Sequence, residues 1–225
     1  MRLVCLGSGS KGNCYLLEGE KECLVIEAGL PFRDVKKALN FNIQKIVGVC
    51  VSHRHFDHSW YAGEYEKAGI PVYKPYERKP KYEAFGGFKI SAFPMIHDVP
   101  CYGFFISHKD FGNLLYASDT EYIQYRFNGD FALNHILVEA NYSKDLISHG
   151  ANREHVLKGH LEIGTTVDFL KANDNENLFN VVLLHLSDRA SNAKMFRQAA
   201  KDAVQYADVY VADAGLEIEL RDTPF

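Results

Sequence analysis

The feature that most constrains this chain is a buried-strand pattern that ends in a dense polar cluster. Residues 45–52, KIVGVCVS, are mostly apolar and rich in β-branched side chains, and HRHFDH at 53–58 follows them directly. The apolar run predicts a strand that is covered on both faces of its sheet, as in α/β proteins. The polar cluster then lies at the carboxyl end of that strand, where open α/β sheets place their functional sites.

The cluster contains His53, His55, Asp57 and His58. His53 and His55 are two positions apart, so in extended backbone their rings point to the same side. A tight turn into a following helix would bring Asp57 and His58 to the same cavity. Neutral imidazoles and a carboxylate are suitable ligands for zinc or a similar divalent cation. A turn of solvated polar residues is the alternative, but so many such side chains in six positions favour a metal site.

Three further polar residues follow or end other apolar runs, namely His97 in FPMIHDVP, Asp119 in LLYASDTE and His185 in VVLLHLSD. Each one alone has a plausible structural role. Because the ends of neighbouring strands meet at one edge of a sheet, we expect the three side chains to complete the metal site.

Strand-like apolar runs alternate with helix-like ones along the whole chain. Strands are expected over residues 2–6, 14–18, 23–27, 45–52, 71–74, 88–93, 102–107, 113–117, 135–140, 180–187, 208–213 and 216–220. Helices are expected over residues 31–40, 58–69, 120–127, 164–173 and 192–207. No break in composition divides the 225 residues, so one domain over residues 1–225 is expected. The alternation predicts two packed sheets with helices outside, an α/β sandwich.

The glycine-rich segment GSGSKGNC at 7–14 invites a nucleotide-binding interpretation. A P-loop needs Lys and then Ser or Thr after its second glycine, followed by a helix. Here Asn13 follows Gly12, and a strand is expected next. We therefore predict a hairpin whose turn is held by Asn13.

The charge balance argues against a protein that grips long nucleic acid. Lys and Arg number 25 against 29 Asp and Glu, a net charge of −4, whereas phosphate contacts dominate nucleic-acid affinity and favour a basic excess. The strip KPYERKPKYE at 74–83 is basic and carries tyrosines, which would suit nucleic acid, but a solvated loop beside an edge strand is the favoured interpretation.

The five cysteines are odd in number and form no CxxC pair, which predicts buried free thiols in a reducing compartment. The N-terminus does not resemble a signal peptide, and no apolar run approaches the length of a membrane span. We expect a cytoplasmic protein with no membrane association.

The motifs, taken together, resemble the metallo-β-lactamase superfamily over nearly the whole chain. HRHFDH matches the HxHxDH motif of that family, and His97, Asp119 and His185 follow in the family's order. The resemblance implies an αββα sandwich with a dinuclear metal site between the sheets. It also implies the ligands: one metal is held by His53, His55 and His97, the other by Asp57, His58 and His185, and Asp119 bridges the two.

Glu139 in LVEANY and His160 in KGHLE resemble the Glu and His motifs of ribonuclease Z-type phosphodiesterases. In that branch the pair is thought to donate a proton to the leaving oxygen. The alternatives are a surface or capped Glu139 and a His160 that caps the next helix. Two departures are evident, because the family's DAG is IEAG here, with Glu27, and its GHST is GHLE. The chain is also too compact for a tRNA-binding arm, so tRNA maturation is not expected.

The resemblance implies a dinuclear-metal hydrolase that cleaves nucleotide phosphodiester bonds, with Asp57, Glu139 and His160 as catalytic residues. Zinc is the expected metal and manganese the alternative. Two similar groups are walJ-type DNA exonucleases and compact phage enzymes that cleave cyclic mononucleotides and blunt immune signalling. The acidic charge favours cyclic mononucleotides, and a single-strand DNA or RNA exonuclease of the walJ type is the alternative. Thioester, lactone and lactam hydrolases share the fold, and dimerisation is common in this branch.

Overall fold

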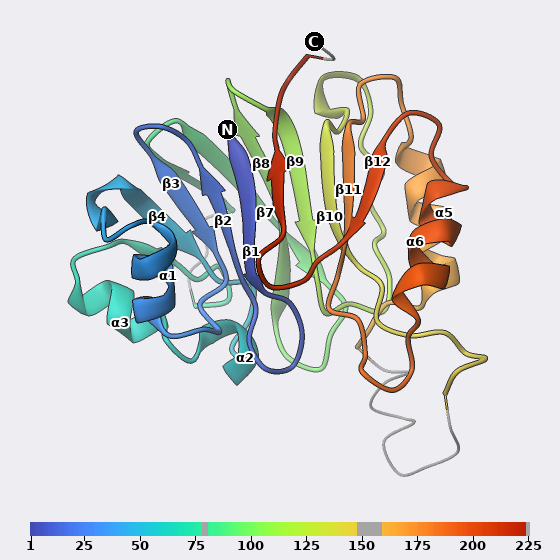
Figure 1. Ribbon diagram of the computed structural model, residues 1–225, viewed down its shortest axis with the longest axis horizontal. Coiled ribbons are helices and arrows are strands. Elements are labelled where there is room, and N and C mark those ends of the chain that lie inside the picture. Colours follow the sequence, from blue (N-terminus) through green and yellow to red (C-terminus); the bar gives the residue numbers. More distant parts are fainter. Residues whose placement is uncertain (78–80, 148–158, 224–225) are drawn as a thin grey trace.

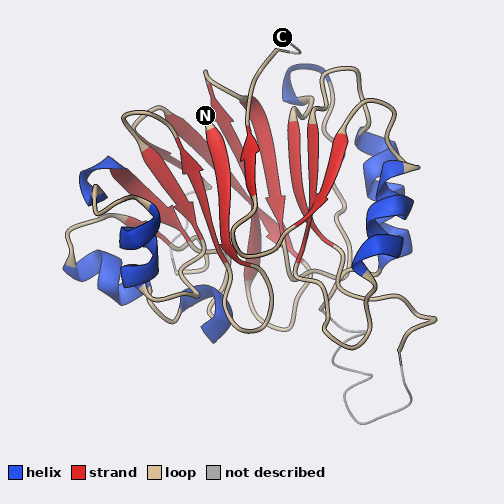
Figure 2. Cartoon of the chain, viewed as in Figure 1, coloured by secondary structure: helices blue, strands red, loops and turns tan. Residues whose placement is uncertain are grey.

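The computed structural model describes residues 1–77, 81–147 and 159–223. Two β-sheets face one another, and helices cover their outer faces (Figure 1). The first sheet has the order β13-β1-β2-β3-β4-β5, and the second has the order β12-β11-β10-β9-β8-β7-β6. Helices α1 (Phe32–Ala38) and α3 (Ala62–Lys67) flank the first sheet, whereas α5 (Ile163–Asn173) and α6 (Ala193–Lys201) flank the second (Figure 2). This arrangement confirms the predicted αββα sandwich.

The strands of the first sheet are β1 (Arg2–Gly7), β2 (Cys14–Glu18), β3 (Cys23–Ile26), β4 (Ile46–Cys50), β5 (Val72–Tyr73) and β13 (Glu217–Glu219). Those of the second sheet are β6 (Tyr82–Phe85), β7 (Phe88–Met95), β8 (Cys101–His108), β9 (Gly112–Ala117), β10 (His135–Glu139), β11 (Asn180–Leu184) and β12 (Asp208–Val211). Strands β3, β4 and β5 are parallel, and so are β9 to β12. The parallel strands of each sheet therefore end at a common edge.

Apolar side chains on alternate positions of each strand build three packed layers. In β2, Tyr15 and Leu17 join the layer between the sheets, whereas Cys14 and Leu16 join the layer beneath α1 and α3. The second sheet packs its other face against α5 and α6 in the same way. Because successive side chains of a strand point to opposite faces, strands buried on both faces need the near-continuous apolar runs seen in the sequence.

The helix predicted over 58–69 is divided into two short helices, α2 (Phe56–Ser59) and α3. The break lies at Tyr61, whose backbone N–H donates to the Ala28 carbonyl instead of to the preceding turn. The helix predicted over 192–207 begins as expected, with the Asn192 side chain accepting from the Met195 N–H, but it ends at Lys201.

The prediction of a helix over residues 120–127 is wrong, because this segment is irregular. The Thr120 hydroxyl accepts the Ile96 N–H and donates to the Tyr122 carbonyl. Further along, the Phe127 N–H donates to the Asn173 side chain. The bonds to Ile96 and Asn173 hold the segment to distant parts of the chain in place of the local bonds of a helix.

The described ranges also contain two short 3-10 turns, η1 (Ile43–Lys45) and η2 (Gly129–Phe131). Strand β6 was not predicted, and it takes up the end of the basic strip at 74–83, of which residues 78–80 lie outside the described ranges. The prediction of buried free thiols is confirmed, since all five cysteines are unpaired and buried. Among the helices of the described ranges, none combines the length and apolar character needed to cross a bilayer.

Candidate metal centre

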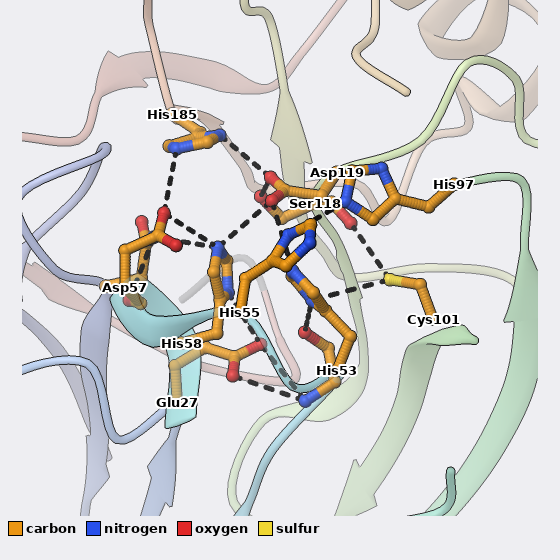
Figure 3. A network of polar contacts seen from close by, with 12 residues as sticks. Glu27, His53, His55, Asp57, His58, His97, Cys101, Ser118, Asp119 and His185 are labelled. Atoms are coloured by element: carbon orange, nitrogen blue, oxygen red, sulfur yellow. Dashed lines mark hydrogen bonds and ion pairs between the residues drawn. The ribbon is translucent and has the colours of Figure 1, made fainter. Parts of the chain in front are cut away.

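The seven predicted metal ligands come together at one edge of the sandwich (Figure 3). They follow the carboxyl ends of β4, β7, β9 and β11, so both sheets contribute. The strand-end rule for α/β sheets explains why residues so far apart in the sequence meet.

The first group of donors is His53, His55, His97 and Asp119, whose ligand atoms lie within 4.8 Å of one another. His53 Nε2 is 3.5 Å from Asp119 Oδ2. His55 Nδ1 is 3.2 Å from His97 Nε2. The group therefore offers three ring nitrogens and one carboxylate oxygen around one point.

The second group is Asp57, His58, Asp119 and His185, which meet the same 4.8 Å limit. Asp119 Oδ2 is 3.1 Å from His58 Nε2, and Asp119 Oδ1 is 2.8 Å from His185 Nδ1. Asp57 Oδ2 closes the group at 3.4 Å from His58 Nε2. Asp119 is common to both groups, and in Figure 3 its carboxylate lies between them.

The donor atoms have the chemistry and spacing that a divalent cation requires. Ligands held at about 2.0–2.1 Å in a tetrahedron are about 3.3 Å apart, close to the distances above. Two ring nitrogens at 3.2 Å, as in His55 and His97, repel unless a proton or a cation lies between their lone pairs. Within the described ranges, the buried Nε2 of His53 has no hydrogen-bond partner. The cluster could therefore bind metal ions.

Contacts to the remaining ring nitrogens orient the donors toward the centre. His97 Nδ1 donates to the Gly159 carbonyl at 2.9 Å, which leaves Nε2 for the site. His53 Nδ1 lies 2.9 Å from the Ser52 hydroxyl. Contacts of this kind fix ring orientation and tautomer in metal sites.

Glu27 contacts the ring of His58 and orients it in the same way. Its buried carboxylate accepts the Ser52 N–H at 3.2 Å and lies 3.4 Å from His58 Nδ1. The Asn13 amide nitrogen lies 2.9 Å from His58 Nε2, the ring nitrogen on the other side. The longer carboxylate in IEAG thus reaches the site from the end of β3.

The backbone at three strand ends adopts a conformation that non-glycine residues rarely take. Glu27, Asp119 and His185 have φ of 65°, 56° and 52°. Such left-handed residues cost on the order of 1–3 kcal/mol each and cluster at functional sites. The turn aims each side chain sharply back over the edge of its sheet.

A close backbone contact holds α2 in place beneath the donors. The Asn13 N–H donates to the Asp57 carbonyl at 2.7 Å, and a Cβ at Gly29 would collide with that same carbonyl oxygen. The predicted role of Asn13 in the hairpin turn is confirmed, since its side-chain oxygen accepts the Gly9 N–H.

Glu139 and His160 form a tight pair beside the donors. His160 Nδ1 lies 2.7 Å from Glu139 Oε1, while Glu139 Oε2 accepts the N–H groups of Thr120 and Leu161 at 3.1 Å. Glu139 is buried, so it is not a surface residue. The N-cap of α5 is Glu162, so His160 does not cap that helix. With Asp119 and His185, the pair makes up a third set of clustered donors.

Five carboxylates lie against the histidines at this edge, those of Glu27, Asp57, Asp98, Asp119 and Glu139. Burial opposes ionisation, but the histidines around Asp57 and Asp119 hold the pKa of both carboxyls below the ordinary range. Burial also disfavours charged imidazoles, yet Asp119 raises the pKa of His58 and His185 well above normal. In the same way, Glu139 raises the pKa of His160 against the effect of burial. The site therefore attracts positive charge, which protons or cations can supply.

Asp98 and Asn13 are among the residues that contact the donors and that sequence reasoning missed. Asp98 Oδ1 lies 3.0 Å from His97 Nε2 and 3.4 Å from His55 Nε2. The Asn13 amide nitrogen is 3.4 Å from Asp57 Oδ2, besides its contact with His58. The position of Asp98 directly after His97 was the available signal. Nothing local in the sequence places the Asn13 amide over α2.

Comparisons with known proteins agree with this architecture. The Lactamase_B model of the metallo-beta-lactamase superfamily matches residues 7–106. Exodeoxyribonuclease WalJ of Streptococcus pneumoniae is 23% identical over 251 residues, which cover 97% of this chain and 92% of WalJ.

Solved structures share the fold over almost their whole length. The metallo-beta-lactamase fold protein YhfI from Bacillus subtilis superposes with a TM-score of 0.72 at 18% identity, covering 96% of this chain and 98% of that one. A diphosphatase from the PhnP family has a TM-score of 0.67 at 16% identity and covers 97% of both chains. The chain thus matches the metallo-beta-lactamase superfamily model over residues 7–106, shares the fold of these solved structures, and has an exodeoxyribonuclease among its relatives.

Proposed function

We propose that this protein is a phosphodiesterase that hydrolyses nucleotide phosphodiester bonds with two divalent cations. Zinc suits the nitrogen-rich donor groups best, and manganese is the alternative. The observation that carries the proposal is the pair of His160 and Glu139, 2.7 Å apart and adjacent to both donor groups through Asp119, which lies 4.0 Å from His160.

The pair of His160 and Glu139 suits the departure of the alkoxide, the difficult step of phosphodiester cleavage. The departing alkoxide is a poor leaving group, and a positioned acid accelerates its departure. Glu139 accepts the Nδ1 proton of His160, which fixes the ring and stabilises its charged form. The proton for the leaving oxygen then comes from Nε2.

The other residues bind and orient the reactants. Bound divalent cations would lower the pKa of water and stabilise the charge that develops on the phosphoryl oxygens. The carboxylates of Asp57 and Asp119 would orient the attacking water beside the phosphate. His160 protonates the leaving oxygen. Of the two aspartates, Asp57 has the more exposed side chain.

Two substrate classes are supported by different observations. The net charge of −4 favours a small substrate, a cyclic mononucleotide, over a long polyanion. The likeness to an exodeoxyribonuclease over 97% of the chain favours single-stranded DNA or RNA. The Glu139–His160 pair resembles the Glu and His motifs of phosphodiesterases, so it favours phosphodiesters over thioesters, lactones and lactams.

A substrate panel tests the proposal. It consists of 2′,3′- and 3′,5′-cyclic mononucleotides, bis(p-nitrophenyl) phosphate, single-stranded DNA and RNA, and a lactam, each assayed with zinc and with manganese. We expect hydrolysis of phosphodiesters. Turnover of the lactam alone would contradict the proposal.

The acid assignment is tested by His160→Gln, which removes the transferable proton. We expect the variant to retain its metals and lose about 10²- to 10⁴-fold in kcat, the usual range for an acid catalyst. His108→Gln is the matched control, because His108 is also held by a carboxylate, Glu22 at 3.1 Å, in another part of the fold. Wild-type rates in the His160 variant would show that another group protonates the leaving oxygen.

Three broader expectations accompany the proposal. We infer one domain over residues 1–225, and we infer a cytoplasmic location, which the five unpaired cysteines favour. A homodimer stays a prediction, since it comes from the resemblance alone.

A further inference from the structure

We propose that Phe56 and Trp60 form a stacking surface for the nucleobase of the substrate. The inference rests on the proposed function, because it assumes that the phosphodiester bound at the metal donors belongs to a nucleotide. It adds where the rest of the nucleotide binds and which chemical group is recognised.

The two rings form an exposed pair, with Phe56 at the start of α2 and Trp60 at its C-cap. Their centroids are 4.3 Å apart at an interplanar angle of 69°. Phe56 is 70% exposed and Trp60 is 57% exposed. The same short helix carries Asp57 and the buried His58 on its inner side, so it presents metal donors inward and aromatic rings outward.

An exposed pair of this kind is not explained by folding. Aromatic side chains supply large apolar areas and normally contribute through burial. Trp60 is the chain's one tryptophan, and it lies on the surface. Exposed apolar side chains that occur singly need no explanation, but paired aromatic rings at the edge of a polar site mark a binding surface.

The donors that solvent reaches most easily lie next to Phe56 in the chain. His55 and Asp57 have side chains that are 34% and 22% exposed, the most of the seven predicted ligands. Phe56 lies between them in the chain. A phosphate that reaches the donors over His55 and Asp57 therefore passes α2, and the base attached to it meets Phe56 and Trp60.

Stacking on aromatic rings suits a nucleobase because each base has a flat π-face. The contact tolerates different bases, so we expect little base selectivity from this surface. It serves a mononucleotide and the terminal nucleotide of a single strand equally well. The inference therefore holds for both substrate classes proposed above.

Two other exposed apolar side chains near the donors, Ile96 and Tyr122, offer a competing surface. Ile96 precedes His97, and Tyr122 follows Asp119 by three positions. The experiment must therefore report on Trp60 itself and not only on nucleotide binding.

Intrinsic fluorescence provides that report, since Trp60 is the only tryptophan in the sequence. The metal-loaded protein is titrated with adenosine 5′-monophosphate and, separately, with ribose 5-phosphate. We expect saturable quenching by the nucleotide and little change with the sugar phosphate. Equal responses, or none while calorimetry detects nucleotide binding, would overturn the inference and favour the Ile96–Tyr122 side.

Kinetics provide the second arm. Thymidine 5′-(p-nitrophenyl phosphate) and methyl p-nitrophenyl phosphate share a leaving group. The KM of the methyl ester divided by the KM of the thymidine ester therefore isolates the effect of the nucleoside. In Trp60→Ala this ratio should fall toward unity by about fivefold or more, the effect of losing one stacked base. Tyr206→Ala is the matched control, because Tyr206 is 60% exposed and lies beyond α6. An unchanged ratio in Trp60→Ala would overturn the inference.

The two arms separate failure of this inference from failure of the proposed function. If wild-type protein cleaves neither ester, the proposed function fails and the fluorescence titration still decides whether a base stacks on Trp60. If it cleaves both esters and Trp60→Ala treats them as wild type does, the function stands and the stacking surface is wrong.

Discussion

Replacing Glu27 by glutamine should weaken metal binding without disturbing the fold. The amide has almost the same shape as the carboxylate, and its oxygen can still accept the Ser52 N–H that Glu27 accepts at 3.2 Å. What the change removes is the negative charge 3.4 Å from His58 Nδ1. That charge favours the ring orientation and basicity that a metal ligand needs.

The size of the effect follows from the burial of both groups. Glu27 and His58 are fully buried, so water does not screen their interaction. A contact to a charged group contributes about 1 kcal/mol more than a contact to a neutral one. Partners of ligating histidines typically affect metal affinity by about 10- to 100-fold. We expect a loss near the lower limit, about tenfold, because the 3.4 Å separation is long for a hydrogen bond.

The assay is competition for zinc against a chromophoric chelator, with wild type and variant measured at the same pH. Glu83→Gln is the control, because the Glu83 carboxylate also accepts a backbone N–H, that of Ala84 at 3.1 Å, but belongs to edge strand β6. Unchanged zinc affinity in Glu27→Gln would refute the argument that Glu27 supports His58.

The remaining predictions concern the shared ligand, the backbone beneath the site and a buried histidine. Asp119→Ala should lose bound metal at both donor groups, and metal analysis that finds one of them still occupied would contradict its shared role. Gly29→Ala should destabilise the fold by about 2 kcal/mol or more, since the added methyl collides with the Asp57 carbonyl. Gly63→Ala should instead stabilise it by about 0.5–1 kcal/mol, since open space surrounds this exposed position in α3; denaturant unfolding measures both. Burial lowers the pKa of His135 from 6.5 to about 4, so between these values the unfolded chain binds a proton that the folded chain does not, and stability falls as the pH falls. His135→Gln should reduce the loss of stability between pH 7 and pH 5 by about 2 kcal/mol, and parallel pH curves for variant and wild type would show that His135 titrates normally.

The fold and most of the donor cluster could be predicted because their signals are local. The apolar runs mark strands buried on both faces, and polar residues at the ends of those runs mark the edge at which parallel strands finish. His97, Asp119 and His185 were found in this way, and the structure brings them to the HRHFDH turn. Their roles as ligands stay predictions until a metal is observed.

What could not be predicted depends on contacts between distant segments. The segment from Thr120 to Phe127 has helical spacing, but bonds to Ile96 and Asn173 hold it in an irregular path. The break between α2 and α3 depends on one bond from Tyr61 to Ala28. Local sequence contains no record of partners 20 or more residues away, so these features require the tertiary structure.

The contacts of Glu27 illustrate the same limit at the site. The sequence identifies it as a departure from the family's aspartate, but not whether a longer side chain can reach the centre. Its left-handed backbone, with φ of 65°, turns the carboxylate back toward Ser52 and His58. A side chain that is one methylene longer is thereby accommodated.

The most direct test of the account is an anomalous diffraction experiment on crystals of zinc-loaded protein, recorded on both sides of the zinc absorption edge. We expect two anomalous peaks about 3.5–4 Å apart, one among His53, His55 and His97, and one among Asp57, His58 and His185, with Asp119 between them. A zinc-loaded crystal with no peak at this edge of the sandwich, or with a peak only between Glu139 and His160, would contradict it.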